Sequence, residues 1–370
     1  MKSRTLLVLL GTLAVMAALA VAVSLSQRPG HGTGAGALLL PDLEAAINTV
    51  DKLVVRGGGD TPLATIQRGA AGWGVGERHG YPADIARLRK TLLALARATI
   101  IEEKTSNPAF YDRLQVEDIE NEAAAGLRLD IGSGSQLLAS VIIGSTGVAG
   151  SDSAYARRAG ENQSWLVKAA LDLPRDATGW LDQRITAIPA SRIATITITQ
   201  PDGASLQLEK ARAGEADFSV ARLPAGRHLS FPGVGNVLGG ILADLDLDAV
   251  EPWADFKPGK GLPTLARFGT FDGLVVEIRT WQLAEGARVH LSASVDEALA
   301  ARYTPAPATA VPAAEAALAA DAIAAATHKD LAAVETEAAK LNARLAGWVY
   351  ALPSYKIEQL TRRMEELLAP

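Results

Sequence analysis

The sequence contains no cysteine in its 370 residues. Disulfide bonds, thiolate metal sites and cysteine nucleophiles are therefore excluded. Aromatic residues are also scarce, at 5%, although apolar residues together make up 48% of the chain. The folded part must have cores of Leu, Ile, Val and Ala with a few large rings, and a chain of this length has room for about two domains.

Basic residues are not in excess, because 36 Lys and Arg stand against 41 Asp and Glu. Residues 1–28 hold Lys2, Arg4 and Arg28 and no acidic residue, which leaves the rest of the chain with a formal net charge of −8. A mildly acidic chain argues against nucleic acid or an anionic membrane surface as its main partner.

One apolar run, residues 6–25, is long enough to span a membrane. As a helix it would rise about 30 Å, the thickness of a bilayer hydrocarbon core. Lys2 and Arg4 favour a cytoplasmic N-terminus. We expect residues 1–28 to form a cytoplasmic stub and a transmembrane signal-anchor. A cleaved signal peptide is the alternative, but the small-x-small sites at residues 18–22 lie inside the run rather than after it.

The remaining chain is expected to form a Gly-rich linker, residues 29–44, and two modules, residues 45–187 and 188–370. The second module repeats the patterns of the first in order. An alternating strand pattern is followed by "LATIQR" or "ASLQLEK", then by "AGWGV" or "ADFSV", and then by an aromatic-Pro pair and a helix. A period of about 145 residues indicates tandem domains rather than a solenoid.

Large rings and prolines recur at matching places in the two modules. The prolines are expected in the first turn of a helix. The sparse Trp residues, Trp253 included, are interpreted as core residues rather than a sugar-binding platform. The predicted structural anchors of the repeat are Trp73, Pro82, Trp165, Phe218, Pro232 and Trp348.

Each module is also expected to contain a hairpin. In the first module it is "AGLRLDIGS" with "LLASVIIG", and in the second "GLVVEIRTWQ" with "ARVHLSASV". The sequence thus predicts an α+β fold, in which an N-terminal transmembrane helix precedes a tandem repeat of two antiparallel-sheet-plus-helix modules.

The second module carries an Ala/Pro-rich insertion at residues 305–346. Residues 313–346 contain no Pro or Gly and are expected to be helical. An apolar stripe on the later half packs either on its own sheet, as most such stripes do, or on a partner. The residues predicted for a partner contact are Leu331, Val334, Leu341 and Leu345.

No motif in the chain has the spacing of a metal, cofactor or catalytic site. The five His residues form no ligand pair, and His79 and His228 are expected in turns. Asp244, Asp246 and Asp248 alternate as in a calcium loop, but the required Gly and Glu are absent. The glycines at residues 233–240 lack the preceding buried strand of a dinucleotide site. We therefore assign no catalytic, metal or cofactor-binding residue, although scattered carboxylates leave a glycosidase-type pair open.

Two basic pairs, Arg157–Arg158 and Arg362–Arg363, are the remaining candidate functional residues. Surface solvation is the ordinary expectation for such pairs. A polar docking patch is the alternative, because Arg is enriched in interfaces.

Several segments together resemble a known family. A Lys/Arg stub and one span precede "GWGV", "YDRLQVED", "IIG", "YARR", "WLV" and "GWVYALPSYKIEQL". These features resemble the bacterial envelope family called domain of unknown function 4340, over residues 45–368. The family's proteins are similar to proteins encoded beside membrane-export ABC transporters, including auxiliary components linked to gliding motility. The family offers no catalytic motif.

The resemblance implies a single-pass protein of the bacterial inner membrane whose bulk is periplasmic. We expect a non-catalytic accessory or scaffold subunit of an ABC-type envelope transport complex, with the membrane and a permease and ATPase as partners and no cofactor. A periplasmic module that binds glycan or another envelope polymer is the alternative. A hydrolase with a dispersed active site comes third.

Overall fold

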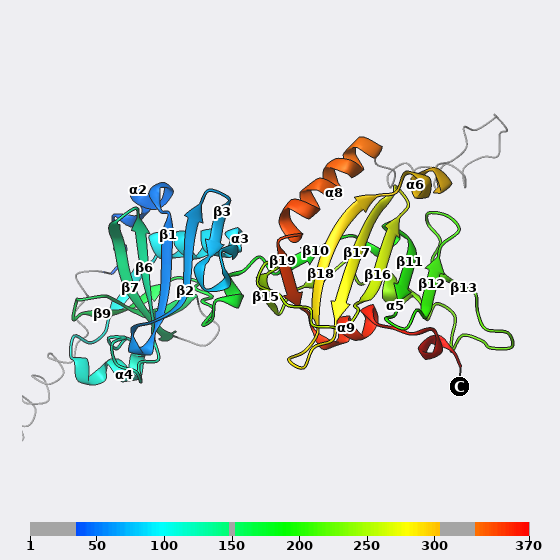
Figure 1. Cartoon of the computed structure of the whole chain (residues 1–370). Helices are drawn as coiled ribbons and strands as arrows, with labels where there is room; N and C mark the ends of the chain where they lie inside the picture. Colours follow the sequence, from blue (N-terminus) through cyan, green and yellow to red (C-terminus); the bar gives the residue numbers. More distant parts are fainter. Residues whose placement is uncertain (1–34, 148–151, 304–329, 370) are drawn as a thin grey trace, which may run out of the picture. The chain divides into compact units, whose positions relative to one another are not determined.

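The computed structural model describes residues 35–147, 152–303 and 330–369 (Figure 1). The predicted membrane span at residues 6–25 and most of the insertion at 305–346 lie outside these ranges. Within them, no helix combines the length and the apolar character needed to cross a membrane.

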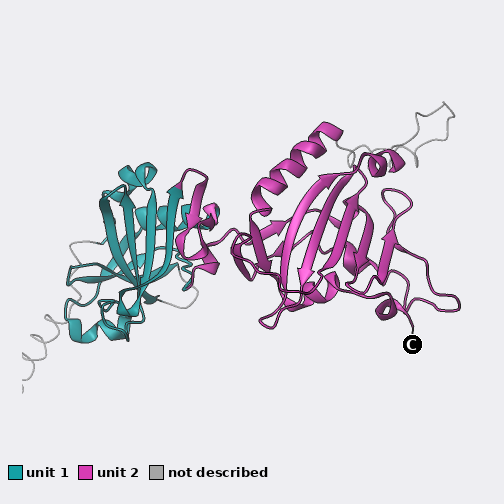
Figure 2. Cartoon of the chain, viewed as in Figure 1, with its two compact units in different colours: residues 1–68, 86–175 teal, residues 69–85, 176–370 magenta. Residues whose placement is uncertain are grey.

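The chain divides into two compact units (Figure 2). Unit 1 contains residues 1–68 and 86–175, and unit 2 contains residues 69–85 and 176–370. The break after residue 175 precedes the boundary predicted at 187. The segment 69–85, expected in the first module, is grouped with unit 2.

The first sheet has nine strands in the order β4-β3-β2-β1-β6-β7-β8-β9-β5. Its described pairs are antiparallel. The accompanying helices are α2 (Leu43–Ala46), α3 (Ile85–Ala96) and α4 (Tyr111–Leu114). The strands are β1 (Lys52–Gly57), β2 (Thr61–Gly69), β3 (Gly72–Val75), β4 (Tyr81–Pro82), β5 (Thr99–Glu103), β6 (Leu127–Ser133), β7 (Gln136–Thr146), β8 (Ser153–Arg158) and β9 (Ser164–Lys168).

The second sheet has eight strands in the order β13-β12-β11-β16-β17-β18-β19-β15. A separate pair joins β10 (Arg184–Thr186) to β14 (Leu245–Asp246). The helices are α5 (Asn236–Gly239), α6 (Glu297–Tyr303), α8 (Leu331–Leu345) and α9 (Ser354–Leu360). The strands are β11 (Ile193–Thr199), β12 (Ser205–Glu209), β13 (Ser219–Ala221), β15 (Ala249–Pro252), β16 (Thr264–Thr270), β17 (Leu274–Trp281), β18 (Arg288–Val295) and β19 (Trp348–Ala351).

The fold is therefore α+β with mostly antiparallel sheets, as predicted. Without β4, the first sheet runs β3-β2-β1-β6-β7-β8-β9-β5. The second sheet has the same spatial order when the strands of each sheet are counted along the chain. The expected hairpin in the second half exists as β17–β18, but β16 precedes it and was not predicted. By position in the sheet, β6–β7 therefore corresponds to β16–β17, so the hairpin match made from the sequence was wrong.

The aromatic-Pro pairs do not open helices. Tyr81–Pro82 forms β4 against β3, and α3 begins only at Ile85. The residue before a proline is biased away from helical geometry, which favours the extended form. Phe231 and Pro232 are exposed in a turn, and the helix after them, α5, is only four residues long.

The end of the predicted linker belongs to the fold of unit 1. Backbone bonds join Gly36 N to Ile100 O at 2.8 Å and Leu39 N to Ala98 O at 2.7 Å, so this segment lies along β5. Leu39, Leu40 and Leu43 are buried. The predicted linker of 29–44 is thus wrong beyond residue 35, because these leucines are core residues.

Helix α8 packs on the sheet of its own unit, alongside β18 (Figure 1). Val334 and Leu345 are buried there, while Leu331 and Leu341 are half-buried. Val334 and Leu345 are therefore core residues and not available for a partner contact, which corrects the prediction for these two.

The helix also completes the hydrogen bonding of β18. β19 pairs with β18 only at Val289. Asn342 of α8 accepts a hydrogen bond from Ala293 N at 2.8 Å and donates one to Ala293 O at 2.7 Å. One amide side chain thus satisfies both backbone groups of a strand position that would otherwise be an open edge.

Candidate functional site

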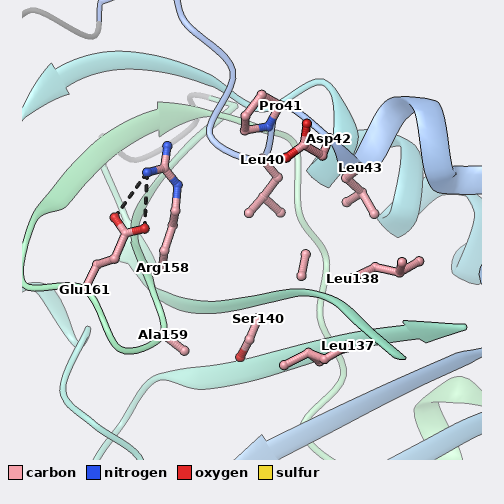
Figure 3. Close-up of a pocket in the computed structure, with 11 residues that line it drawn as sticks. Leu40, Pro41, Asp42, Leu43, Leu137, Leu138, Ser140, Arg158, Ala159 and Glu161 are labelled. Carbon is pink, nitrogen blue, oxygen red and sulfur yellow. Dashed lines mark hydrogen bonds and ion pairs between the residues drawn. The ribbon is translucent and has the colours of Figure 1, made fainter. Parts of the chain in front are cut away.

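One face of the sheet in unit 1 is hollowed by two adjoining cavities of about 440 and 500 Å³. They share Leu137, Ser140 and Ala159. Figure 3 shows the first, with residues 40–43 on one side and the start of β7 on the other. Arg158 and Glu161 are paired at 3.1 Å on its rim. The volumes are in the range of ligand sites, roughly 300–1,000 Å³.

The second cavity lies over β1 and β6, whose outward side chains line it. Side chains two residues apart on a strand share a face, so Lys52, Val54 and Arg56 of β1 lie opposite those of β6. In the register, Arg56 faces Arg128 and Val54 faces Asp130. Two like charges directly opposite would be unfavourable without a compensating carboxylate.

Asp130 supplies that carboxylate. Its Oδ2 accepts hydrogen bonds from Arg56 Nε at 3.1 Å and Arg128 Nε at 3.3 Å. Ser140, its cross-strand neighbour on β7, donates to Oδ1 at 2.6 Å. Asp60 and Glu120 accept from Arg128 at 2.9 and 3.1 Å. The result is a half-buried network of paired charges on the floor of the hollow.

Backbone geometry brings Asp60 to this network. It lies in a tight turn after β1, with the positive φ of 53° that only a few non-glycine residues adopt. Gly58, two residues earlier, approaches the backbone so closely that an added Cβ would lie 2.5 Å from Glu122 O. Glycine is therefore required at residue 58.

Replacing Asp130 with asparagine should lower the free energy of unfolding by about 1–3 kcal/mol, because two guanidinium groups would face each other without their shared charge. Urea denaturation of the wild type and the variant measures the change. Asp248→Asn, at an exposed aspartate of unit 2, is the control and should change stability little. An equal loss in both variants would contradict the role given to Asp130.

In the first basic pair, Arg157 is buried, whereas Arg158 is half-buried. Arg157 is only 2% exposed, and its Nε and Nη1 donate to Val116 O and Glu161 O, each at 2.8 Å. Its Nη2 lies 2.5 Å from Asp118, and its guanidinium lies 4.6 Å from the centre of the Tyr111 ring. Arg157 therefore fixes the segment before β6 on the sheet, and the expected solvation was wrong for it.

The second basic pair does lie at the surface. Arg362 is 3.5 Å from Glu366, and Arg363 is 2.8 Å from Asp202. All four side chains are at least 30% exposed, so these ion pairs contribute little to stability.

The other predicted anchors have different surroundings. Trp165 and Phe218 are buried, while Trp73 and Pro82 are half-buried and Pro232 is exposed.

Trp348 packs edge-to-face on Tyr81 at 5.0 Å, within unit 2. Tyr350 lies 6.2 Å from Tyr81. Burial raises the pKa of both phenols, so they stay protonated.

The acidic and histidine candidates are not brought together. Asp244 and Asp246 pair with Arg184 at 3.3 and 2.7 Å. Across residues 35–147, 152–303 and 330–369 no group of three or more His, Asp or Glu has the geometry of a metal site. His79 has the left-handed conformation of a turn.

Sequence reasoning missed a buried ion network in unit 2. Arg192 donates to Asp272 at 2.8 Å and to Glu337 at 2.8 Å, and Asp272 is fully buried. Glu337 belongs to α8, which this network ties to the start of β11 and the β16–β17 turn. No local motif signals such a set, because its members lie far apart in the sequence.

We expect His290 of β18 to make the stability of unit 2 depend on pH. Its Nε2 lies 3.1 Å from Ala346 O, and its Nδ1 has no hydrogen-bond partner among the described residues. Burial lowers its pKa, as does Arg279, whereas the bond to Ala346 and the charge of Glu277 raise it. Since the folded pKa lies below the unfolded value of about 6.5, the unfolded state binds more protons, and stability falls as the pH drops through that value.

We expect His290→Phe to flatten this acid-side decline between about pH 7.5 and 5.5. Denaturation curves at the two pH values measure it. His228→Phe, at an exposed histidine, should keep the wild-type decline. The assignment fails if the two variants behave alike.

The profile of a family described as Domain of unknown function (DUF4340) matches residues 73–252, from Trp73 of β3 to Pro252 of β15. No curated protein matches the chain, and no solved structure does. The match confirms the family inferred from the sequence, over residues 73–252 rather than the expected 45–368.

Proposed function

We propose that the protein is a non-catalytic scaffold subunit of an ABC-type envelope transport complex. The apolar run at residues 6–25 would anchor it in the bacterial inner membrane, and its two units would lie in the periplasm. The run and the basic residues Lys2 and Arg4 support the anchor. The resemblance to the family supports a role in a transport complex, with a permease and its ATPase as partners.

The observation that carries the proposal is the hollowed sheet face of unit 1. Its arginines and carboxylates are bonded to one another, with Asp130 at the centre. A catalytic acid or base needs a proton-transfer position open to a substrate, whereas here the carboxylate is occupied by two guanidinium groups and a hydroxyl. Such a surface offers shape and fixed hydrogen-bonding groups, which suits binding.

We also propose that the two units are a tandem repeat. The shared strand order supports it, as does the equivalence of Leu53 and Ile196 within that order. Each lies on an interior strand, β1 or β11, between buried partners on both sides. A duplicated scaffold would offer two related faces on one chain.

A second candidate, binding of a glycan or another envelope polymer, is favoured by the composition of the same hollow. Ser140, Gln136 and the Arg128–Asp130 pair present donors and acceptors at fixed spacing. Neutral hydroxyl groups can bond to such pairs without bringing a charge that needs compensation.

In-cell crosslinking of the tagged full-length protein, followed by purification in mild detergent and mass spectrometry, tests the scaffold role. Leu137→Asp is the site variant, because this leucine is 60% exposed and lines both hollows. Val237→Asp, at an exposed valine of unit 2, is the matched control. Deletion of residues 306–327 tests the insertion while it retains α8, which is part of the core.

A permease and its ATPase should be recovered with the wild type and the control, and several-fold less with Leu137→Asp. Recovery of the protein alone in every case would contradict the scaffold role. Loss of partners only in the deletion variant would move the contact from the hollow to the insertion.

A further inference from the structure

Unit 2 contains a third cavity, of about 520 Å³, that none of the preceding functions uses. It lies between the loop of residues 258–262 and the end of β17. Its floor is the last cross-strand pair of β16 and β17, Thr264 and Thr280, which are both buried. The cavity lies against this hairpin, and the loop of residues 258–262 forms another of its walls.

The walls of this cavity are mainly apolar. Leu262 in the loop is 72% exposed, a large fraction for a leucine in a folded unit. Trp281 also lines the cavity, and its ring packs against Phe256 at 5.3 Å and Trp253 at 5.8 Å between ring centroids. The remaining apolar wall residues are Pro201, Pro258, Leu283 and Ala284. An apolar ligand would cover Leu262 and complete the packing on Trp281.

The polar groups on the floor of the cavity leave few free hydrogen-bonding positions for a polar ligand. The Thr264 hydroxyl donates to Gln200 at 3.1 Å, and Gln200 in turn donates to Thr361 O at 2.8 Å. The Thr280 hydroxyl is enclosed by protein atoms and has no hydrogen-bond partner among the described residues. A sugar would therefore find few hydrogen-bond partners at the floor of the cavity, whereas an alkyl chain needs none.

Lys260 supplies the one charge of the lining. It is exposed in the outer loop, next to Leu262. An exposed ammonium beside an apolar cavity favours a ligand with an apolar body and an anionic end at the mouth.

We propose that this cavity binds the alkyl chain of an anionic single-chain amphiphile, such as a long-chain fatty acid. The chain lies between Leu262 and Trp281, and the carboxylate lies at the mouth beside Lys260. The binding is separate from the scaffold role, because the two sites lie in different units and use different residues.

The test is photo-crosslinking of full-length protein in amphipol with a long-chain fatty acid that carries a diazirine on its chain. Mass spectrometry of the peptides locates the label, which separates the cavity from any label on residues 6–25. The expected label is on peptides that contain Leu262 or Trp281, and excess unlabelled fatty acid should reduce it at least tenfold.

Two variants test which residues contact the alkyl chain and the carboxylate. Leu262→Asp should reduce the cavity label at least tenfold, and its exposure makes the change harmless to folding. Lys260→Glu should reduce labelling by the acid several-fold and leave labelling by its methyl ester unchanged. Val237→Asp should match the wild type. Cavity label that is absent, or equal in Leu262→Asp, overturns the proposal, and an equal loss for acid and ester in Lys260→Glu overturns the placement of the carboxylate.

Discussion

Replacing Arg157 with methionine should lower the free energy of unfolding of unit 1 by about 3 kcal/mol. Methionine keeps much of the length and apolar contact of the side chain but donates no hydrogen bond. The carbonyl groups of Val116 and Glu161 would lose their donor, and Asp118 would lose its ion pair. Denaturant unfolding, followed by hydrogen exchange in the segment 105–119, measures both the loss and its location.

Arg362→Met is the matched control, because it removes an arginine from the other basic pair. Its partner Glu366 is 49% exposed, so we expect a change of less than about 0.5 kcal/mol. Equal effects in the two variants would show that burial of Arg157 does not contribute to the stability of unit 1. Faster exchange in the segment 105–119 should occur only in Arg157→Met.

Gly144→Ala in β7 should have an effect of similar size, at least about 3 kcal/mol, because the added methyl group would overlap backbone. A Cβ at this position would overlap the carbonyl oxygen of Leu114 and lie 2.8 Å from that of Gln115. Gly126, the residue before β6, is similarly close, because an added Cβ would overlap the carbonyl oxygen of Gln115. The two glycines let the segment that Arg157 holds lie directly on the sheet.

Gly347→Ala provides the control for this substitution. An added Cβ there meets no atom within 4 Å, so its effect should stay within about 0.5 kcal/mol. Thermal or urea unfolding of the two variants gives the comparison. A mild effect of Gly144→Ala would mean that the segment 105–119 can lift from the sheet at little cost.

The sequence was informative where one face of a strand or helix is buried and the other is not. Leu53 and Val55 alternate in β1 and are fully buried, and Leu88, Leu92 and Leu95 form the buried face of α3. These patterns predicted the first strands, the helix and the class of the fold. The apolar stripe of α8 was also recognised, although its target was left open.

Apolar alternation did not predict β16. Its core face carries Thr264, Ala266 and Phe268, while Leu265 lies on the other face. A small residue and a threonine on the buried face give little apolar alternation, so the strand was missed and the hairpins were matched incorrectly.

The charged site could not have been predicted with the same rules. Arg56, Arg128 and Asp130 read as ordinary outward residues of strands, and only the register places them face to face. Arg157 and Arg158 look alike in sequence, yet the fold buries the first. Spacing along the chain does not report which cation meets a carbonyl group from a distant segment.

The pairing of residues 36–39 with β5 has a consequence for making soluble fragments. A fragment that starts at residue 45, the predicted module boundary, would leave the edge of β5 unpaired and remove Leu39, Leu40 and Leu43 from the core. An open edge of this kind invites strands of other molecules to add to it. A fragment for crystallisation should therefore start before Gly36, with the segment that closes the edge included.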